Sequence, residues 1–298
     1  FFYGIKNFAG VDTYYGALSE YVDTMVYSGD YAFYRNIFDF AYGLDDLHTS
    51  HVFTGYYENP TFEFELELSD FGLRSQTYIT RRSSTRDLYE ARFGTLDAVP
   101  FSRTTQDGKT AIIYIDGFDV ETPTTFMRAL DLLPETVENV VIDLGNNGGG
   151  NIGAVLRIFG YMTEETFTYH SQNPADGSAA TYYIESDYVA YDYNWFVMTS
   201  SVTFSAANLF ASMAKELGIP VIGQDASGGA SSIGIILPPG GSTLLISTNN
   251  VLSARVMNDL GEYEYLSVEY GIKVDYKLDD ITDDDEITTL IDQILNME

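Results

Sequence analysis

From Thr110 onward the chain alternates between short apolar runs and helical segments, and this alternation restricts the fold more than any other feature. The apolar runs are bounded by turn residues and lie at Ala111–Ile115, Val140–Leu144, Trp195–Thr199, Val221–Gly223 and Leu244–Ser247. Helical periodicity fills intervals between them at Thr124–Leu133, Ile152–Met162 and Ala206–Leu217. Strands that alternate with helices form a sheet whose faces the helices cover. We therefore predict an α/β core.

The N-terminal region is predicted to be helical over residues 1–55. Apolar residues recur every three or four positions through Val11–Val26, and a second helical pattern covers about Tyr31–Tyr42. Gly43 is expected to end that second helix.

Residues 56–107 are predicted to form a small β-rich insertion. Phenylalanines and leucines alternate with glutamates through Thr61–Leu68, which predicts a half-buried strand. The charged, serine-rich segment Arg81–Arg86 predicts an exposed turn before another short strand. Residues 108–298 then form the core domain, and its last element is an amphipathic helix capped at Thr282.

Charge and composition exclude several classes of partner. Lysine and arginine together number 15 against 44 acidic residues, for a net charge of −29, so we expect no nucleic-acid binding and no polybasic membrane contact. The chain has no cysteine and three histidines, and we expect no metal and no cofactor. No apolar run is long enough to span a bilayer. Strong acidity, 24 tyrosines and the absence of cysteine suit an extracellular or cell-envelope bacterial protein. Because the sequence starts at Phe1 and not at methionine, we expect that any signal segment is missing here.

Three segments carry residues suited to chemistry, and each also has a purely structural interpretation. The strand ending at Asp143 runs into a glycine-rich turn, Gly145–Gly150, which is either a tight connection or a cradle of backbone N–H groups for an oxyanion. Ser205 begins a helix, as a cap or as a nucleophile. His48 and His51 follow a helix. They are either surface residues of a loop, or one of them is a general base.

The order of these segments resembles the C-terminal processing peptidases, also called tail-specific proteases, and their relative the tricorn core peptidase. The matching stretches read L-D-D-L-H-T, D-L-G-N-N-G-G-G, T-F-S-A-A-N and, at Glu269–Asp275, E-Y-G-I-K-V-D. The similarity covers about Ala111–Asp275, with a further short match around His48. It implies a crotonase-like (ββα) serine peptidase core, with the N-terminal helical region and the small β insertion attached to it.

The resemblance also implies roles for individual residues. Ser205 matches the nucleophile, and the backbone N–H groups of Ala206 and Gly149 match the oxyanion hole. The processing peptidases activate their serine with a lysine roughly 25 residues downstream, but no lysine lies between positions 216 and 272 here. The tricorn branch uses a histidine, which implies His48 as base with Glu269 as its orienting carboxylate; His51 is the second alignment.

Three further positions depart from the family pattern. Gly145 stands where relatives carry arginine, Asn208 where they carry glutamate, and Val274 where proline is usual. The insertion is about 50 residues long, which is short for a complete PDZ domain, and it has no clear carboxylate-binding loop.

The sequence therefore favours a secreted serine-type endopeptidase that hydrolyses peptide or protein substrates. The alternative is a catalytically inactive protein that binds peptides or apolar ligands on the same scaffold. Acyl-CoA chemistry fits less well, because the acidic surface would repel the cofactor's phosphates. The sequence leaves the oligomeric state and the cleavage specificity open.

Overall fold

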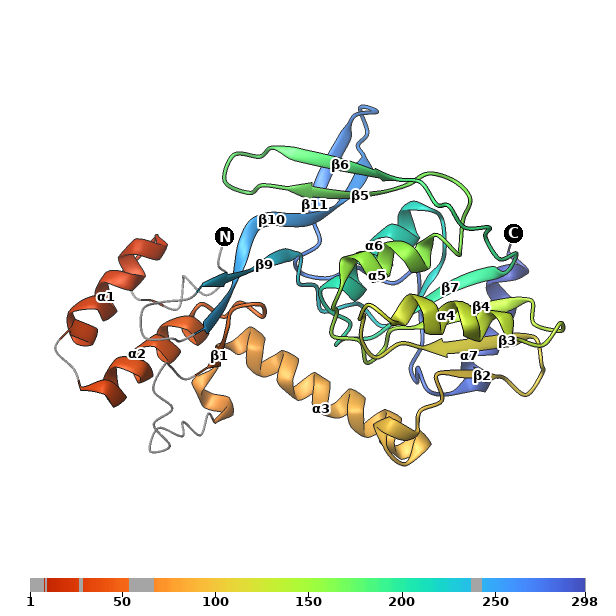
Figure 1. Cartoon of the computed structure of the whole chain (residues 1–298), viewed down its shortest axis with the longest axis horizontal. Coiled ribbons are helices and arrows are strands. Elements are labelled where there is room, and N and C mark those ends of the chain that lie inside the picture. Colours follow the sequence, from red (N-terminus) through yellow and green to blue (C-terminus); the bar gives the residue numbers. More distant parts are fainter. Residues whose placement is uncertain (1–7, 9, 27–28, 54–66, 237–242, 298) are drawn as a thin grey trace. The chain divides into compact units, whose positions relative to one another are not determined.

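The computed structural model describes residues 8, 10–26, 29–53, 67–236 and 243–297 (Figure 1). The chain divides into two compact units. Unit 1 comprises Phe1–Thr80 with Ser231–Asn250, and unit 2 comprises Arg81–Ala230 with Val251–Glu298. Within the described ranges, no helix is both long and apolar enough to cross a membrane.

Unit 2 is built on a six-stranded sheet with the order β12-β8-β7-β4-β3-β2. Its strands are β2 (Ser102–Thr104), β3 (Thr110–Tyr114), β4 (Asn139–Asp143), β7 (Asn194–Thr199), β8 (Val221–Gly223) and β12 (Tyr276–Lys277). All neighbours are parallel except β2, which runs antiparallel to β3. Side chains of β3 and β4 are buried at every position, as expected for parallel strands covered on both faces.

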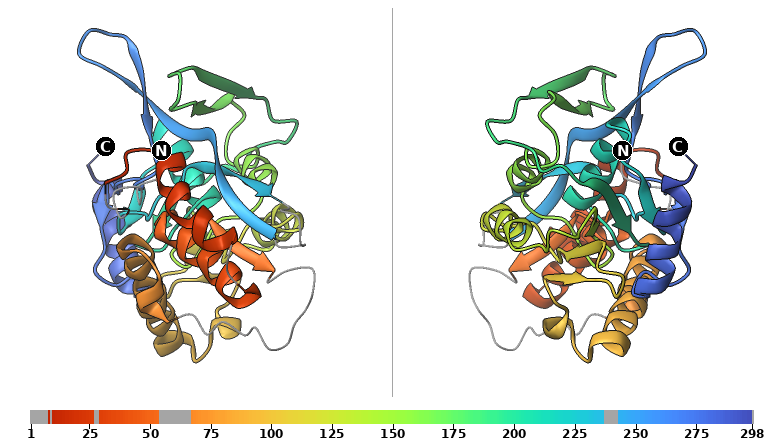
Figure 2. Two further views of the ribbon diagram at one scale, coloured as in Figure 1. Left: turned by 90° about the vertical axis from the view of Figure 1, so that its left-hand side faces the viewer. Right: turned by 90° about the vertical axis from the view of Figure 1, so that its right-hand side faces the viewer.

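Helices cover both faces of this sheet. Successive strand residues point to opposite faces, and because both sets of side chains are apolar, both faces have to be buried. Ile113, Ile142 and Val197 pack with α4 (Thr122–Asp131), α5 (Ile152–Phe159) and α6 (Ala206–Glu216). Ile112, Val141 and Phe196 pack instead with α7 (Asp284–Leu295) and with Tyr89 of α3 (Leu73–Phe93). Figure 2 shows α7 and the α4–α5 pair on opposite sides of the strands. The predicted α/β core is confirmed.

A second, antiparallel group of strands completes unit 2. It contains β5 (Phe167–Gln172), β6 (Ala179–Ile184), β11 (Tyr263–Ser267) and the last residues of β10 (Thr243–Met257). β10 pairs with β5 through Leu252 opposite Ser171, and with β11 through Ala254 opposite Leu266. The sequence patterns did not predict β5, β6 or β11, and they predicted only the first part of β10.

Unit 1 contains α1 (Tyr14–Val26), α2 (Asp30–Gly43), β1 (Ser50–Phe53), β9 (Ser231–Ile236) and the first residues of β10. The two helices confirm the predicted helical region, and α2 ends at Gly43 as expected. Tyr21 of α1 makes edge-to-face contacts with Phe40 of α2 and with Phe8, and these contacts help to hold α1 and α2 together. β1 is antiparallel to β10, with Ser50 opposite Leu245.

The predicted β-rich insertion is wrong in the part that the structure describes. The predicted strand Thr61–Leu68 lies largely outside the described residues, and the segment after it is mainly the long helix α3. The expected turn at Arg81–Arg86 lies inside that helix. Only Thr85 and Tyr89 of α3 are buried, so its apolar stripe is too narrow to be recognised as a helical period.

The cap of the last helix also differs from the prediction. α7 begins at Asp284, and the carboxylate of Asp283 accepts hydrogen bonds from the N–H groups of Asp285 and Glu286. The hydroxyl of Thr282 donates instead to Asp280. Asp283 is therefore the N-cap, one residue later than expected.

Candidate active site

Ser205 lies at the start of α6, directly after the loop that follows β7. Its backbone has φ +56° and ψ −121°, a positive-φ conformation that residues other than glycine rarely adopt. The side chain makes no capping hydrogen bond to the helix. The interpretation of Ser205 as an ordinary helix cap is therefore wrong, and the strained backbone requires another explanation.

Two backbone hydrogen bonds hold Ser205 in this conformation. Its own N–H donates to the carbonyl of Gly228 over 2.7 Å, and the N–H of Phe204 donates to the carbonyl of Asn147 over 3.0 Å. The serine is thus fixed between the glycine-rich turn after β4 and the loop after β8. Both loops follow the carboxyl ends of parallel strands, where ligand sites of α/β sheets usually lie.

The glycine-rich turn approaches Ser205 at Gly149. This glycine has φ +108°, and a β-carbon added to it would stand 2.6 Å from the Cβ of Ser205. The buried amide of Asn147 shapes the turn: its Nδ2 donates to the carbonyl of Ile115, and its Oδ1 accepts the Gly149 N–H over 2.7 Å. The turn has room for glycine alone at this position.

The same bond bears on the predicted oxyanion hole. Because the Gly149 N–H already donates to Asn147, it is not available to an oxyanion in this structure unless that bond is shared or broken. The Ala206 N–H belongs to the first residue of α6, where a helix has no internal acceptor. Among the described residues it has no hydrogen-bond partner. A helix N-terminus with such an N–H favours negative charge.

Glu269 follows β11, and backbone bonds connect its segment to that of Ser205. Its carboxylate Oε2 accepts the Ala230 N–H over 2.7 Å, and its carbonyl accepts the Gly229 N–H over 3.0 Å. The neighbouring Gly228 is the residue whose carbonyl binds the Ser205 N–H. One short loop, Gly228 to Ala230, therefore bonds to both Ser205 and Glu269.

Asn208, which stands where relatives carry glutamate, joins these segments a second time, a role that the sequence analysis did not predict. The side chain is fully buried on the first turn of α6. Its Nδ2 donates to the Val268 carbonyl over 2.9 Å, and its Oδ1 accepts the Ile272 N–H over 3.0 Å. The amide thereby holds both sides of the turn that carries Glu269, three residues after Ser205 along the chain.

His48 belongs to unit 1, whereas Ser205 and Glu269 belong to unit 2. His48 is 5 % exposed and lies in the turn between α2 and β1. The carboxylate of Asp46 accepts the Thr49 hydroxyl, which closes that turn. Asp45 accepts the N–H groups of Arg74 and Ser75 at 2.9 Å, so it caps the start of α3.

The other two histidines differ from His48. The backbone of His51 pairs with Leu244 between β1 and β10, and its side chain lies outside the described part of the structure. The buried His170 bonds through Nε2 to Glu216 at 2.8 Å and through Nδ1 to the Thr181 hydroxyl at 2.9 Å. His170 therefore serves as a structural residue.

The structure accounts for two departures from the family pattern. A side chain at Gly145 would overlap the Tyr89 hydroxyl and would stand 2.6 Å from Ile281, so an arginine has no room there. The N–H of Val274 donates to Asp225 over 3.1 Å, a bond that proline could not make.

Beneath Gly145 lies the fully buried carboxyl of Asp143, at the end of β4. Its Oδ1 accepts the Tyr89 hydroxyl over 2.7 Å and the Gly145 N–H over 2.9 Å. Burial raises the pKa of Asp143, although the charge of Arg103 and the bond from Tyr89 oppose the shift. Burial also raises the pKa of Tyr89. Asp143, held by the hydroxyl of Tyr89, thus accepts a hydrogen bond from the first residue of the glycine-rich turn and fixes where that turn begins.

Several solved structures share the fold at low sequence identity. A putative peptidase from Parabacteroides merdae is 17 % identical with a TM-score of 0.65, over 98 % of this chain and 92 % of that one. Mature CPAF is 12 % identical with a TM-score of 0.65, over 99 % and 94 %. A lipoprotein from Streptococcus agalactiae is 12 % identical with a TM-score of 0.59, over 96 % and 90 %. No curated protein is significantly similar to the chain in sequence.

The family assignment rests on sequence. The model of peptidase family S41 matches residues 109–275, more than half of the chain, and this range contains Ser205, Gly149 and Glu269. It agrees with the predicted extent of the resemblance, and the structural neighbours agree with the predicted fold. The chain belongs to peptidase family S41 and is a serine-type peptidase of the hydrolase class.

Proposed function

We propose that this protein is an endopeptidase that cleaves peptide bonds through an acyl-enzyme, with Ser205 as nucleophile, His48 as base and Glu269 as orienting carboxylate. The observation that carries the proposal is the backbone of Ser205. A serine that neither caps its helix nor adopts a relaxed conformation costs stability. That cost is understandable if the strained turn presents the hydroxyl to a substrate, as strand–turn–helix serines of other hydrolases do.

In the proposed reaction, His48 accepts the hydroxyl proton of Ser205 as Oγ attacks the peptide carbonyl carbon. The proton then passes to the leaving amine as the carbon–nitrogen bond breaks and the acyl-serine remains. The same histidine then deprotonates a water molecule, whose oxygen attacks the acyl carbon. The bond between that carbon and Oγ breaks, the new carboxyl product leaves, and the histidine returns the proton to Ser205 Oγ. Glu269 would fix the tautomer of the imidazole and stabilise its protonated form.

The Ala206 N–H is the oxyanion donor that we propose. A single such donor is worth roughly 10²–10³-fold in kcat. Gly149 would complete the oxyanion hole in one of two ways. Its N–H could be shared between Asn147 and the oxyanion, or it could leave Asn147 and donate to the oxyanion when substrate binds. Its other contribution is steric, because it lets the turn lie against Ser205.

Ser205→Ala tests the proposal, with Ser201→Ala in the same loop as the matched control. Using neutral and basic fluorogenic peptides, which suit the net charge of −29, we expect Ser205→Ala to lose about 10⁴-fold or more in kcat and Ser201→Ala to stay near wild type. Equal rates for wild type and Ser205→Ala would remove Ser205 from the mechanism. His48→Ala beside His51→Ala distinguishes the two candidate bases.

A ligand-binding protein without catalysis remains the second candidate. The missing lysine and the engaged Gly149 N–H favour it. A fluorophosphonate probe separates the two, since labelling at Ser205 contradicts a pure binding role and a folded protein that stays unlabelled supports one. We also propose an extracellular or cell-envelope location in bacteria, to be checked by cell fractionation.

A further inference from the structure

Unit 2 contains a cavity of about 430 Å³ beside the turn that carries Glu269. Its walls come from the second half of α6, from the paired strands β10 and β11, and from Val268 and Gly271 on either side of Glu269. Ser205 and Glu269 are not among the residues that line it. Its volume lies within the range of small-molecule sites, about 300–1,000 Å³. The cavity is therefore a candidate ligand site distinct from these two proposed catalytic residues.

The lining of this cavity is rich in positive charge, although acidic residues outnumber basic ones 44 to 15 in the chain. Lys215, Arg255 and Lys273 line it together with a single acidic residue, Glu216. Lys215 is bonded to Asp275 at 2.5 Å, and Arg255 is bonded to Glu216 at 2.7 Å. In the described part of the chain, the ammonium of Lys273 has no ion pair and no hydrogen bond. Lys273 therefore supplies a charge that a bound anion could balance.

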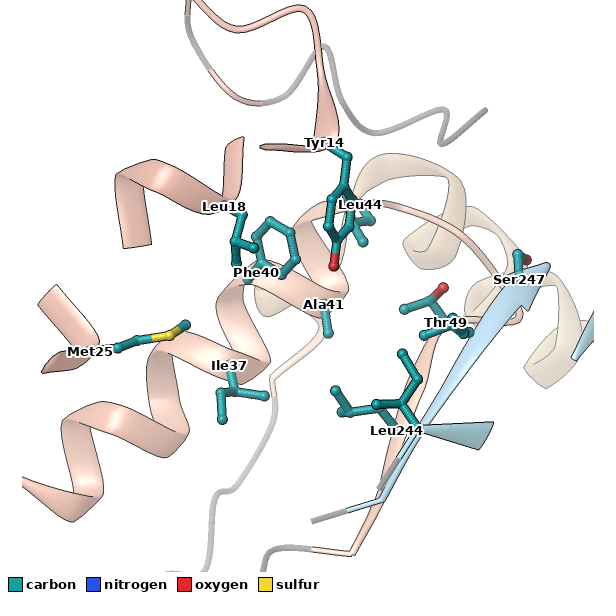
Figure 3. A pocket seen from close by; sticks show the side chains of 12 residues that line it. Tyr14, Leu18, Met25, Ile37, Phe40, Ala41, Leu44, Thr49, Leu244 and Ser247 are labelled. Carbon is teal, nitrogen blue, oxygen red and sulfur yellow. The ribbon is translucent and has the colours of Figure 1, made fainter. Parts of the chain in front are cut away.

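Charge distinguishes this cavity from the one in unit 1, which has a volume of about 540 Å³. Figure 3 shows that the unit 1 cavity lies among side chains such as Leu18, Phe40 and Leu244. Among the described residues that line it, none carries a charge. An anion placed there would lose its hydration without compensation, so we expect an anion in the unit 2 cavity instead.

Ser212 of α6 offers the unit 2 cavity a hydrogen-bond donor. The side chain lines the cavity and is only 8 % exposed, and its hydroxyl has no hydrogen-bond partner in the ranges that the structure describes. It is not one of the hydroxyls that are closed off from solvent, which are those of Ser247 and Ser253. Buried hydroxyls are usually bonded, because an unpaired one is unfavourable. A ligand atom that accepts a hydrogen bond would satisfy Ser212.

Apolar side chains form the rest of the lining. Ala254 lies opposite Leu266 in the β10–β11 pair, and Val256, two residues farther along β10, points to the same face. Val268 and Ile272 are buried and close the cavity beside the turn of Glu269. Hydrocarbon that covers such a surface gains about 25 cal/mol per Å² of buried apolar area, whereas a hydrated inorganic anion gains nothing from it. The ligand should therefore carry an apolar body as well as a charge.

We propose that this cavity binds a small organic monocarboxylate, which is a molecule with one carboxylate and a short apolar body. The carboxylate binds the ammonium of Lys273 and accepts the hydroxyl of Ser212, and the apolar body lies against Leu266 and Ile272. One uncompensated lysine suits a single negative charge better than the two of a phosphate. The site does not depend on peptidase activity. A free acid and the C-terminus of a short peptide present the same chemistry, and the test separates them.

The test is isothermal titration calorimetry of the full chain, as wild type and as Ser205→Ala, with 4-phenylbutyrate at low salt. We expect saturable binding of one molecule per chain in both proteins. The uncharged 4-phenylbutyramide should bind about tenfold more weakly or less, because it loses the bond to a charged group. Acetate should be weaker by a similar factor, because it lacks the apolar body.

Three outcomes with these probes would overturn the ligand class. Equal affinity for the acid and the amide would remove the anion from the proposal. Equal affinity for acetate and 4-phenylbutyrate would remove the apolar walls. Inorganic phosphate that competes as well as 4-phenylbutyrate would replace the carboxylate by a general anion.

A pair of lysine variants tests the location of the site. Lys273→Glu reverses the uncompensated charge and should weaken binding of 4-phenylbutyrate about tenfold or more. Lys277→Glu is the matched control, because Lys277 is also exposed but does not line the cavity, and it should bind as wild type does. Equal affinities in the two variants, or linear binding without saturation in wild type, would overturn the site.

A pair of serine variants tests the hydrogen bond. Ser212→Ala should lower the affinity for 4-phenylbutyrate about tenfold. Ser253→Ala removes a hydroxyl that is closed off from solvent and does not line the cavity, and it should leave the affinity unchanged. Equal affinities in these two variants would overturn the role of Ser212.

The source of the carboxylate is tested with acetyl-alanyl-phenylalanine, whose C-terminal carboxylate is free. Only binding that Lys273→Glu weakens is assigned to this cavity. Tighter binding of the peptide than of 4-phenylbutyrate would assign the site to peptide C-termini, and weaker binding would assign it to free acids.

Discussion

Gly149 and Ser205 lie so close together that a β-carbon on the glycine would stand 2.6 Å from the β-carbon of the serine. Gly149→Ala should therefore displace Ser205 or the turn, and misplacement of a reacting group by about 1 Å costs on the order of 10²-fold in rate. Peptide hydrolysis measures the loss. Gly177→Ala is the control, because that glycine also has positive φ but faces open space. A matched loss in both variants would attribute the effect to backbone strain alone.

Asn208→Ala should lower kcat by about tenfold or more with little change in KM, because the amide holds the turn that carries Glu269. Two backbone groups would lose their partner, at a cost of roughly 1–3 kcal/mol each in the free energy of unfolding. A change in the pH profile of kcat/KM separates positioning from plain destabilisation. Asn139→Ala, a buried asparagine at the start of β4, should destabilise without altering that profile. Similar profiles for the two variants would refute the positioning role.

The buried carboxyl of Asp143 predicts an unusual pH dependence. Its pKa is raised in the folded state, so it contributes stability below the unfolded-state value of about 3.9, and this contribution is lost as pH rises through the folded-state pKa. Asp143→Asn keeps an acceptor for Tyr89 and Gly145 but cannot ionise. Denaturant midpoints from about pH 4 to about pH 8 should show the variant gaining on wild type as pH rises. A constant difference between the two proteins would mean that Asp143 does not titrate in this range.

Asp45→Ala should destabilise unit 1 by about 1 kcal/mol, since it removes the cap of α3. Asp45→Asn should recover most of the loss, because asparagine tolerates the φ of +50° at this position and its carbonyl oxygen can still accept. Thermal unfolding of both variants provides the measurement. If asparagine were as harmful as alanine, the negative charge rather than the hydrogen bond would be the source of the effect.

The sequence predicted the sheet core well because its strands are buried on both faces. Continuous apolar runs placed β3, β4, β7 and β8 to within about a residue of their observed bounds. β10 was recognised only at Leu244–Ser247 because polar residues interrupt the rest of that long strand. α3 was missed because two buried side chains define no clear period.

The candidate site divides in a similar way. Local motifs placed Ser205 and Gly149, because strand, turn and helix follow one another within a few residues. The bonds from Asn208 to Val268 and from Asp45 to Ser75 join residues 60 and 30 positions apart, so no local pattern reveals them. The participation of His48 stays a prediction, since it belongs to a different unit from Ser205.

The backbone of Ser205 has a consequence for how this chain could change over generations. Glycine would adopt φ +56° at no cost, whereas serine gives up on the order of 1–3 kcal/mol there. In a descendant that no longer needs catalysis, the single substitution Ser205→Gly would increase the stability of the fold. Keeping the hydroxyl lowers the free energy of unfolding in every generation. A lineage that has lost hydrolysis would have no selection to keep serine at this position.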